Sequence, residues 1–167
     1  LVNTTELAGR AREAGLINPN MPGTATTDSD ILGALLAHGA ADSSIEQAAL
    51  ELLPTVRGAF CLIFMDENTL YAARDPFGVR PLSLGRLDRG WVVASETAAL
   101  DIVGASFVRD IEPGELLAID ADGVRSSRFA NPTPKGCVFE YVYLARPDST
   151  IAGRSVHAAR VDIGRRL

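Results

Sequence analysis

The chain has 167 residues, enough for one ordinary domain or for one domain and the start of another. Its composition, 47% hydrophobic and 22% charged, is typical of globular proteins and excludes a largely disordered chain. The net charge of −5 provides no general attraction to nucleic acids or anionic membranes, and we expect neither as a partner.

The first third of the chain has the pattern of helices. A start signal of Ser, Thr or Asp precedes each of three apolar stretches of helical period, and Gly or Pro follows each. A link rich in Pro and Gly, Asn18–Gly23, separates the first two. The predicted helices begin at Thr4 or Thr5, at Thr27-Asp28-Ser29-Asp30 and at Ser44, and they end at Gly15, Gly39 and Pro54.

From Gly58 onward, short apolar runs alternate with turns, which indicates antiparallel strands. Helices followed by such strands predict an α+β domain built in layers. The predicted strands are Gly58–Phe64, Leu70–Ala73, Leu82–Leu84, Trp91–Ala94, Phe107–Ile111, Glu115–Ile119 and Val124–Phe129, with a short helix over Glu96–Val103.

The last part of the chain begins with a predicted linker, Phe129–Gly136, that contains two prolines. Cys137–Leu144 alternates and is rich in aromatic residues, which predicts a strand. It leads into a charged turn, Arg146-Pro147-Asp148-Ser149, where a guanidinium, a carboxylate and a hydroxyl share one rigid loop. A basic helix is predicted over Ser155–Leu167.

Asp28 is the first candidate for a functional side chain, and it has two interpretations. As a helix N-cap it accepts hydrogen bonds from backbone N–H groups, and the spacing alone favours this structural role. Alternatively, its carboxylate points outward and binds a cationic group. Beside a helix N-terminus, which favours anions, such a carboxylate would suit an amino acid.

Two further segments combine charge with rigid turns. In the turn between Ala73 and Leu82, Arg74 and Asp75 are expected to pair and order the connection, while two arginines, Arg74 and Arg80, flank it and are placed to line a pocket. After the next hairpin, Ser95 is the expected N-cap of the short helix and Glu96 suits its dipole.

The cysteines predict no disulfide framework. Cys61 lies in an apolar run and is expected to be a core residue. Cys137 is either a partly buried strand residue or one ligand of an iron–sulfur cluster whose other cysteines lie outside these residues. No secretory signal or membrane-length apolar run is evident in the sequence, so we expect a cytoplasmic protein.

Several segments together resemble the amidophosphoribosyltransferase family, also called glutamine phosphoribosylpyrophosphate amidotransferases. The Phe139–Ser149 run is specific to this family, whereas the Arg-Asp-Pro-x-Gly and Ala-Ser-Glu segments recur in related glutaminases. The matching segments, which fit in order and spacing over nearly the whole chain, are Leu1–Thr4, Thr27–Asp30, Arg74–Leu82, Ala94–Thr97, Glu112–Glu115 and Cys137–Ser149.

The resemblance implies the C-terminal part of a class II glutaminase domain over residues 1–131. The fold of that domain is an αββα sandwich of the N-terminal-nucleophile type, expected to be incomplete in this chain. The start of a phosphoribosyltransferase domain follows over 132–167. In this family the first domain releases ammonia from glutamine. The second uses the ammonia, with Mg²⁺, to convert phosphoribosyl pyrophosphate into 5-phosphoribosylamine, the first step of purine synthesis. The intact enzyme is expected to be a homo-oligomer.

The resemblance also assigns roles to a few residues. Asp28 matches the aspartate that binds the glutamine α-ammonium, and Cys137 matches one possible ligand of a 4Fe-4S cluster. Tyr141, Tyr143, Arg146, Asp148 and Ser149 match the junction where the two domains are coupled. No catalytic residue is matched, because the family's nucleophile, base and oxyanion pair correspond to positions before Leu1. We therefore expect this chain alone to be inactive.

Two alternatives remain open at this stage. The chain is either part of this enzyme or a stand-alone binding or regulatory module of the same fold that has no catalytic activity. A fragment of another class II glutamine amidotransferase, such as asparagine synthetase, is a further alternative. The Arg146–Ser149 loop argues against that last reading.

Overall fold

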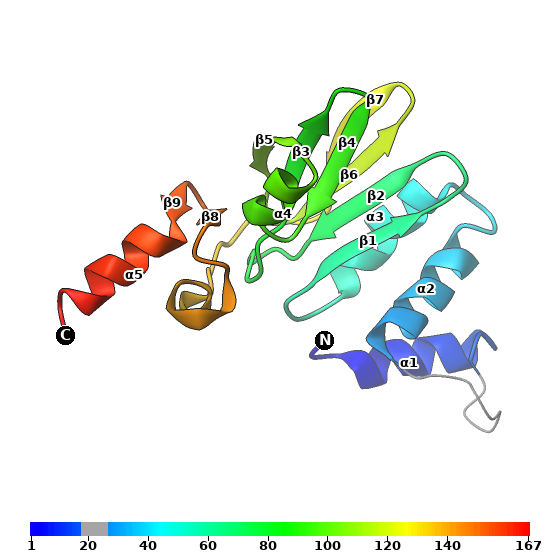
Figure 1. Ribbon diagram of the computed structural model, residues 1–167. Coiled ribbons are helices and arrows are strands. Elements are labelled where there is room, and N and C mark those ends of the chain that lie inside the picture. The colour runs from blue at the N-terminus through cyan, green and yellow to red at the C-terminus, as the bar shows by residue number, and fades with distance from the viewer. Residues whose placement is uncertain (18–26) are drawn as a thin grey trace.

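The structure is a computed structural model that describes residues 1–17 and 27–167, so the predicted link Asn18–Gly23 lies outside the described residues. Two sheets stack face to face, with helices outside each of them (Figure 1). The helices are α1 (Thr4–Glu13), α2 (Asp28–Gly39), α3 (Ile45–Leu52), η1 (Leu53–Thr55), α4 (Thr97–Ile102), η2 (Glu140–Leu144) and α5 (Val156–Gly164). The strands are β1 (Cys61–Met65), β2 (Leu70–Arg74), β3 (Ser83–Leu87), β4 (Gly90–Ala94), β5 (Ser106–Asp110), β6 (Glu115–Asp120), β7 (Gly123–Arg128), β8 (Thr150–Ile151) and β9 (Arg154–Ser155).

The predicted helix starts are confirmed, and the caps differ in detail. The Thr27 side chain accepts from the Asp30 backbone N–H while the Asp30 carboxylate accepts from Thr27, a capping box that starts α2. Ser44 caps α3 in the predicted way. Helix α1 begins after Asn3, which makes no capping hydrogen bond with its side chain.

The first sheet pairs its strands in the order β1-β2-β6-β7, all antiparallel, and is buried on both faces. Because successive side chains of a strand point to opposite faces, each central strand contributes to two cores. On β2, Tyr71 and Ala73 pack against α1–α3, whereas Ala72 packs against the second sheet. On β6, Leu116 faces the helices and Leu117 faces the second sheet.

The second sheet, in the order β4-β3-β5, lies between the first sheet and helix α4. On β3, Leu84 belongs to the core between the sheets. The next residue, Gly85, faces α4 so closely that a Cβ there would lie 2.8 Å from the Leu100 side chain. The layers are therefore helix, sheet, sheet and helix, with a single short helix in the last layer of the described residues.

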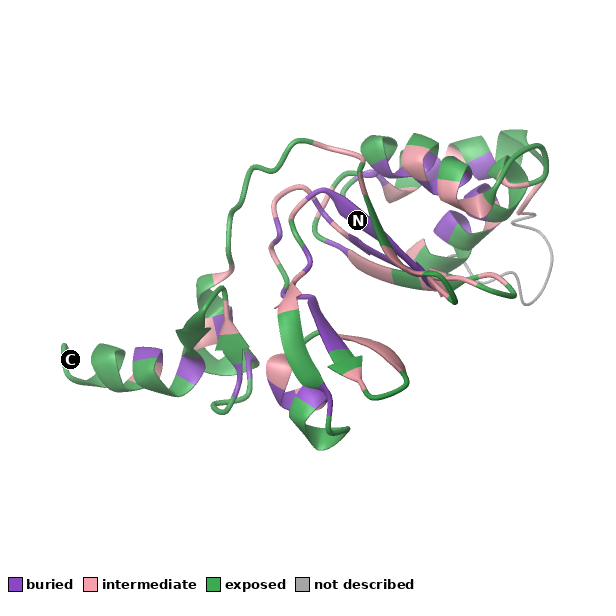
Figure 2. Cartoon of the chain, turned by 90° about the horizontal axis from the view of Figure 1, so that it is seen from above, coloured by how far each residue is buried: buried purple, intermediate pink, exposed green. Residues whose placement is uncertain are grey.

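Residues 129–137 form an exposed connection without regular secondary structure, visible in Figure 2 as the strip that leads to the C-terminal elements. The predicted linker is thus observed. Gly114 holds its start in place: it has φ +76°, donates to Arg74 and Asp75 carbonyls, and would bring a Cβ within 2.3 Å of the Ala130 carbonyl oxygen.

The predicted strand over Cys137–Leu144 is wrong. These residues form a helical turn that includes η2, closed by an i to i+5 hydrogen bond from Ala145 N to Glu140 O at 3.1 Å. Arg160 of α5 stabilises the turn by donating to the carbonyl oxygens of Tyr141 and Ala145. The alternation of aromatic residues mimics a strand, but Val138, Phe139, Val142 and Tyr143 are all exposed.

The C-terminal elements complete the described fold. Strands β8 and β9 form a two-residue hairpin that the sequence reading missed, with Ala152 and Gly153 both at positive φ. The predicted helix that follows is confirmed as α5, capped by the Ser155 side chain. Together with η2, these elements lie at one end of the sandwich (Figure 1).

Candidate functional site

A pocket of about 390 Å³ lies at the N-terminus of α2, beside the chain segment that enters β1. Asp28 stands in its wall as the first residue of the helix. Because Thr27 and Asp30 supply the capping interactions, the Asp28 carboxylate is not needed as an N-cap. The capping interpretation of Asp28 is therefore wrong. The lining residues are Leu1, Asp28, Ser29, Leu32, Ala59, Phe60, Cys61, Leu62, Arg80, Pro81 and Ser95.

The Asp28 carboxylate is held in place by a hydrogen bond from helix α1. The Thr4 hydroxyl donates to Oδ1 at 2.6 Å, and Leu1 lies beside Asp28 in the lining of the pocket. The carboxylate thus stands in the pocket wall as a candidate partner for a cationic group.

Cys61 is the thiol in the wall of this pocket. Its Sγ lies 3.7 Å from the carbonyl oxygens of Arg80 and Pro81, and burial raises its pKa to about 11. A thiol acts as a nucleophile only as the thiolate. Cys61 is therefore neutral at physiological pH, in agreement with the prediction of a structural role.

The turn between β2 and β3 is held by Arg74, although not in the predicted way. The Arg74 guanidinium donates to three carbonyl oxygens, those of Arg80, Ile111 and Gly78, at 2.7–3.0 Å. Asp75 is fully buried and accepts instead from the backbone N–H groups of Phe60 and Phe77. The predicted pair between Arg74 and Asp75 is thus replaced by two separate sets of backbone contacts that fix the turn.

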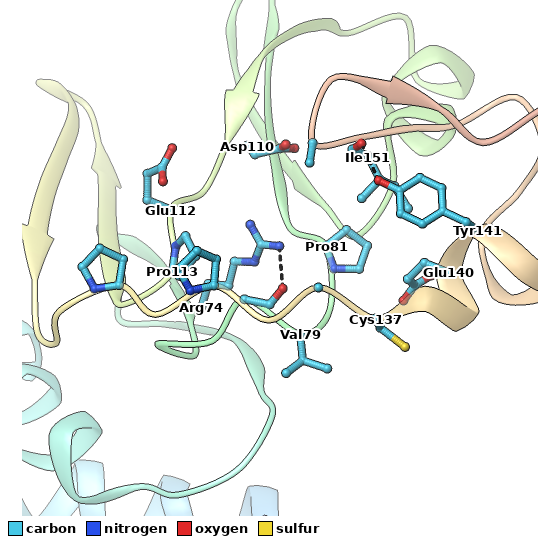
Figure 3. A pocket seen from close by; sticks show the side chains of 15 residues that line it. Arg74, Val79, Pro81, Asp110, Glu112, Pro113, Cys137, Glu140, Tyr141 and Ile151 are labelled. Carbon is cyan, nitrogen blue, oxygen red and sulfur yellow. Dashed lines mark hydrogen bonds between the residues drawn. The ribbon is translucent and has the colours of Figure 1, made fainter. Parts of the chain in front are cut away.

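A second cavity, of about 520 Å³, lies between this turn and the C-terminal elements (Figure 3). Arg74 and Pro81 form one side of it, and Cys137, Glu140 and Tyr141 form the other. We call it the junction cavity. The two arginines that flank the turn do not share a pocket: Arg74 lines the junction cavity and Arg80 lines the Asp28 pocket.

The predicted coupling residues divide into four environments, of which that of Ser149 is described in the next paragraph. The Tyr141 hydroxyl donates to the Ile151 carbonyl oxygen at 2.9 Å, beside the junction cavity. Tyr143 is exposed and packs against Phe139 with ring centroids 5.8 Å apart. Arg146 and Asp148 form a bidentate ion pair with each other on the surface. The structure therefore brings Cys137 and Tyr141 together at one cavity and leaves Tyr143 outside it.

Ser149 is buried, and it reveals a residue whose role the sequence reading missed. Its hydroxyl donates to Glu96 Oε2 at 2.6 Å, and the Arg146 backbone N–H donates to the same oxygen at 2.8 Å. Ser95 is not the N-cap of α4, because Glu96 occupies that position and makes no capping hydrogen bond. Glu96 instead anchors the Arg146–Ser149 loop. The loop lies about fifty residues later in the sequence, so no local sequence pattern predicts this contact.

The described residues do not form a metal site by themselves. No group of three or more His, Cys, Asp or Glu side chains is gathered in residues 1–17 and 27–167. An iron–sulfur cluster is held by four ligands, usually cysteines, and Cys137 brings one thiol to the junction cavity. The residues present thus do not fit a cluster on their own, and the structure contains no Mg²⁺ ligand set within the same ranges.

Comparison with known proteins assigns the family. Residues 2–102 match the glutamine amidotransferase domain family model. The chain belongs to this family. Over all 167 residues it is 89% identical to the amidophosphoribosyltransferase of Mycobacterium tuberculosis strain H37Rv, and over 168 aligned positions it is 38% identical to that of Bacillus subtilis. The resemblance predicted from the motifs is confirmed.

The fold agrees with solved structures of the same enzymes. The chain matches the Bacillus subtilis glutamine phosphoribosylpyrophosphate amidotransferase complexed with ADP and GMP at a TM-score of 0.91, with 37% identity over 99% of this chain and 35% of that one. This match confirms the predicted αββα sandwich of N-terminal-nucleophile glutamine amidotransferases. The chain spans about a third of the length of the curated relatives it matches, 32% for Mycobacterium tuberculosis and 34% for Bacillus subtilis.

None of the helices that the structure describes is both long and apolar enough to cross a bilayer.

Proposed function

We propose that this chain is part of an amidophosphoribosyltransferase, in which the Asp28 pocket holds glutamine. The observation that carries the proposal is the place of the Asp28 carboxylate: it stands in the pocket wall at the start of α2, and Thr27 and Asp30, not Asp28, make the helix cap. The α-ammonium of a free amino acid is a donor that suits such a carboxylate. The position beside the N-terminus of α2 also suits the α-carboxylate, because backbone N–H groups and the helix dipole favour an anion there.

The described residues bind and orient the substrate but supply no activated nucleophile to this pocket. The thiol they contribute is that of Cys61, whose raised pKa keeps it protonated. Hydrolysis of the glutamine amide therefore requires a nucleophile from a part of the enzyme that this chain does not contain. We propose accordingly that the 167-residue chain alone is inactive.

The substrates of the whole enzyme follow from the names of its relatives, which are glutamine phosphoribosylpyrophosphate amidotransferases. We propose that ammonia released from glutamine attacks phosphoribosyl pyrophosphate and displaces pyrophosphate, giving 5-phosphoribosylamine. We also propose that the whole enzyme uses Mg²⁺, that Cys137 is a cluster ligand, and that the enzyme is a cytoplasmic homo-oligomer. We further propose a domain boundary at residue 131. The coupling roles are proposed for Tyr141, Tyr143, Arg146, Asp148 and Ser149.

The test uses the whole protein encoded by the gene beside the 167-residue chain. Each is incubated with glutamine, phosphoribosyl pyrophosphate and Mg²⁺, and the glutamate and pyrophosphate formed are measured. The whole protein should form both products in equal amounts, and the shorter chain should form neither. A whole protein that forms no pyrophosphate with either glutamine or ammonia as the nitrogen donor would support the non-catalytic module.

A further inference from the structure

Arg80 lies between the two cavities. Its side chain lines the Asp28 pocket, while its Nη1 atom lies 2.8 Å from Oε1 of Glu140, which lines the junction cavity. The two residues come from different parts of the fold, Arg80 from the turn before β3 and Glu140 from η2. One ion pair therefore connects the wall of the amino-acid pocket to the C-terminal elements.

Glu140 depends on this partner. Its side chain is only 2% exposed, and neither carboxylate oxygen receives a hydrogen bond of good geometry from the part of the chain that the structure describes. A buried carboxylate without a countercharge is costly, so the Arg80 guanidinium is drawn toward Glu140. The position of the Arg80 side chain is thus set by where Glu140 lies.

The backbone of Arg80 has little freedom to move with Glu140. Its carbonyl oxygen accepts from Arg74 Nε at 2.9 Å, and the neighbouring Gly78 carbonyl accepts from Arg74 Nη2 at 3.0 Å. Gly78 itself has φ +55°, and a Cβ there would lie 2.8 Å from Pro113. Any response of Arg80 to a change at Glu140 must therefore come from its long side chain, which is 48% exposed.

The Arg80 side chain has a second carboxylate within the pocket that it lines. Asp28 lines the same pocket and is partly exposed, with 41% of its side chain open to solvent. A guanidinium released from Glu140 would be attracted to this carboxylate, and a bidentate pair between them would be of the stronger kind. In that position it would compete with an α-ammonium group for the same oxygens.

We propose that Glu140 holds Arg80 away from Asp28, so that the C-terminal segment keeps the amino-acid pocket open. Arg80 is then a positioning residue whose release closes the pocket to substrate. A second attachment, through Glu96 to Arg146 and Ser149, fixes the same segment to the start of α4. The proposal rests on the proposed function, because it takes glutamine as the occupant of the Asp28 pocket.

The experiment compares Glu140→Gln, Arg80→Gln/Glu140→Gln and the exposed control Glu67→Gln in the whole enzyme. Two readouts are used: glutamine binding by calorimetry and the glutamine KM for pyrophosphate release, with ammonia-dependent release as the measure of the intact transferase. Glu140→Gln should raise the glutamine Kd and KM roughly tenfold, within the usual range of coupling between sites. The double variant should return both to within about twofold of wild type, because the competing guanidinium is gone.

A purely structural role for the pair would give a different pattern. If both variants weaken glutamine binding equally, or if Glu140→Gln leaves it unchanged, Arg80 does not compete for Asp28 and the proposal is overturned. Calorimetry separates this failure from that of the proposed function. A wild-type enzyme that binds glutamine without turnover still tests the competition, and one that neither binds nor hydrolyses glutamine refutes both.

Discussion

Arg109 of β5 and Glu115 of β6 join the two sheets by a bidentate ion pair, with Nη1 to Oε2 at 2.8 Å and Nη2 to Oε1 at 2.7 Å. Glu115 is buried, and it also accepts from the Glu112 backbone N–H and from the Ser126 hydroxyl. The same carboxylate thus links the second sheet, the tight turn at Pro113-Gly114 and strand β7. This contact gives a structural reason for the Glu-Pro-Gly-Glu segment in the sequence.

Glu115→Gln should lower the free energy of unfolding by about 2–3 kcal/mol. The amide cannot accept both guanidinium hydrogen bonds, and it places an NH₂ group against donors. The cost stays below that of a fully buried pair because Arg109 is 38% exposed and water can reach it. Denaturant unfolding checks this value against Glu112→Gln, an exposed control that should change it by less than about 0.5 kcal/mol. Equal losses for both variants would contradict the assigned role.

The same carboxylate predicts the acid limb of the stability curve. Burial raises the Glu115 pKa, but the hydrogen bonds from Arg109 and Ser126 outweigh burial and lower it below the ordinary 4.5. A group with a lowered folded pKa stabilises the fold above its unfolded pKa and loses that contribution as the pH falls through the folded value. The difference in unfolding free energy between wild type and Glu115→Gln should therefore shrink below about pH 4.5. A difference that stays constant down to pH 3 would be inconsistent with this linkage.

Glu96→Ala should loosen the Arg146–Ser149 loop without unfolding the sandwich. The variant removes the charged Glu96 carboxylate, which accepts two hydrogen bonds from the loop. A hydrogen bond to a charged group contributes about 1.5–3 kcal/mol to stability. Amide hydrogen exchange over 145–150 should accelerate at least tenfold, while exchange in β2 and β6 stays unchanged.

The matched control for Glu96 is Asp148→Ala, which breaks the exposed pair between Arg146 and Asp148. Because an exposed ion pair contributes about 1 kcal/mol or less, its effect on exchange should be several-fold smaller. A loop that exchanges equally fast in both variants would show that Glu96 is not its anchor.

Cys61 should resist alkylation although it lines a pocket. With a pKa of about 11, only about one thiol in a thousand is ionised at pH 8. Iodoacetamide should therefore modify Cys61 at least a hundredfold more slowly than free cysteine, as followed by peptide mass spectrometry. Fast labelling at pH 8 in the folded protein would refute the assignment of a neutral thiol.

The regular elements were predictable because their signals are local. Alternation and turns located β1–β7 within a few residues, and Ser or Thr start signals located α2 and α3. The segment Cys137–Leu144 was misread since its aromatic alternation has the strand period, whereas the contacts from Arg160 that hold it as a helical turn come from a later element. A local sequence pattern cannot predict such long-range contacts.

The candidate site divides in the same way. Asp28 was predicted as a candidate functional residue because it lies at the start of a helix. In the structure Thr27, not Asp28, is the N-cap of that helix. Glu96 and Arg80 lie in recognised motifs, yet their partners, Ser149 and Glu140, are about fifty to sixty residues later. Only the folded arrangement of the sandwich and the C-terminal elements brings these pairs together. The parts of the site that the sequence did not predict depend on tertiary contacts of this kind.

The central claim, that Asp28 binds the α-ammonium of glutamine, is tested most directly by Asp28→Asn beside Asp30→Asn in the whole enzyme. The two aspartates lie two residues apart on α2. Asp28 lines the pocket, whereas Asp30 only completes the capping box. The measurement is the glutamine KM, with ammonia-dependent pyrophosphate release as the reference. Asp28→Asn should raise the glutamine KM about 10- to 150-fold, the loss of a hydrogen bond to a charged group, and leave the ammonia-dependent rate intact. Asp30→Asn should lower stability by about 1 kcal/mol with the KM unchanged; a glutamine KM unaffected by Asp28→Asn, or shifted equally by both variants, would contradict the account.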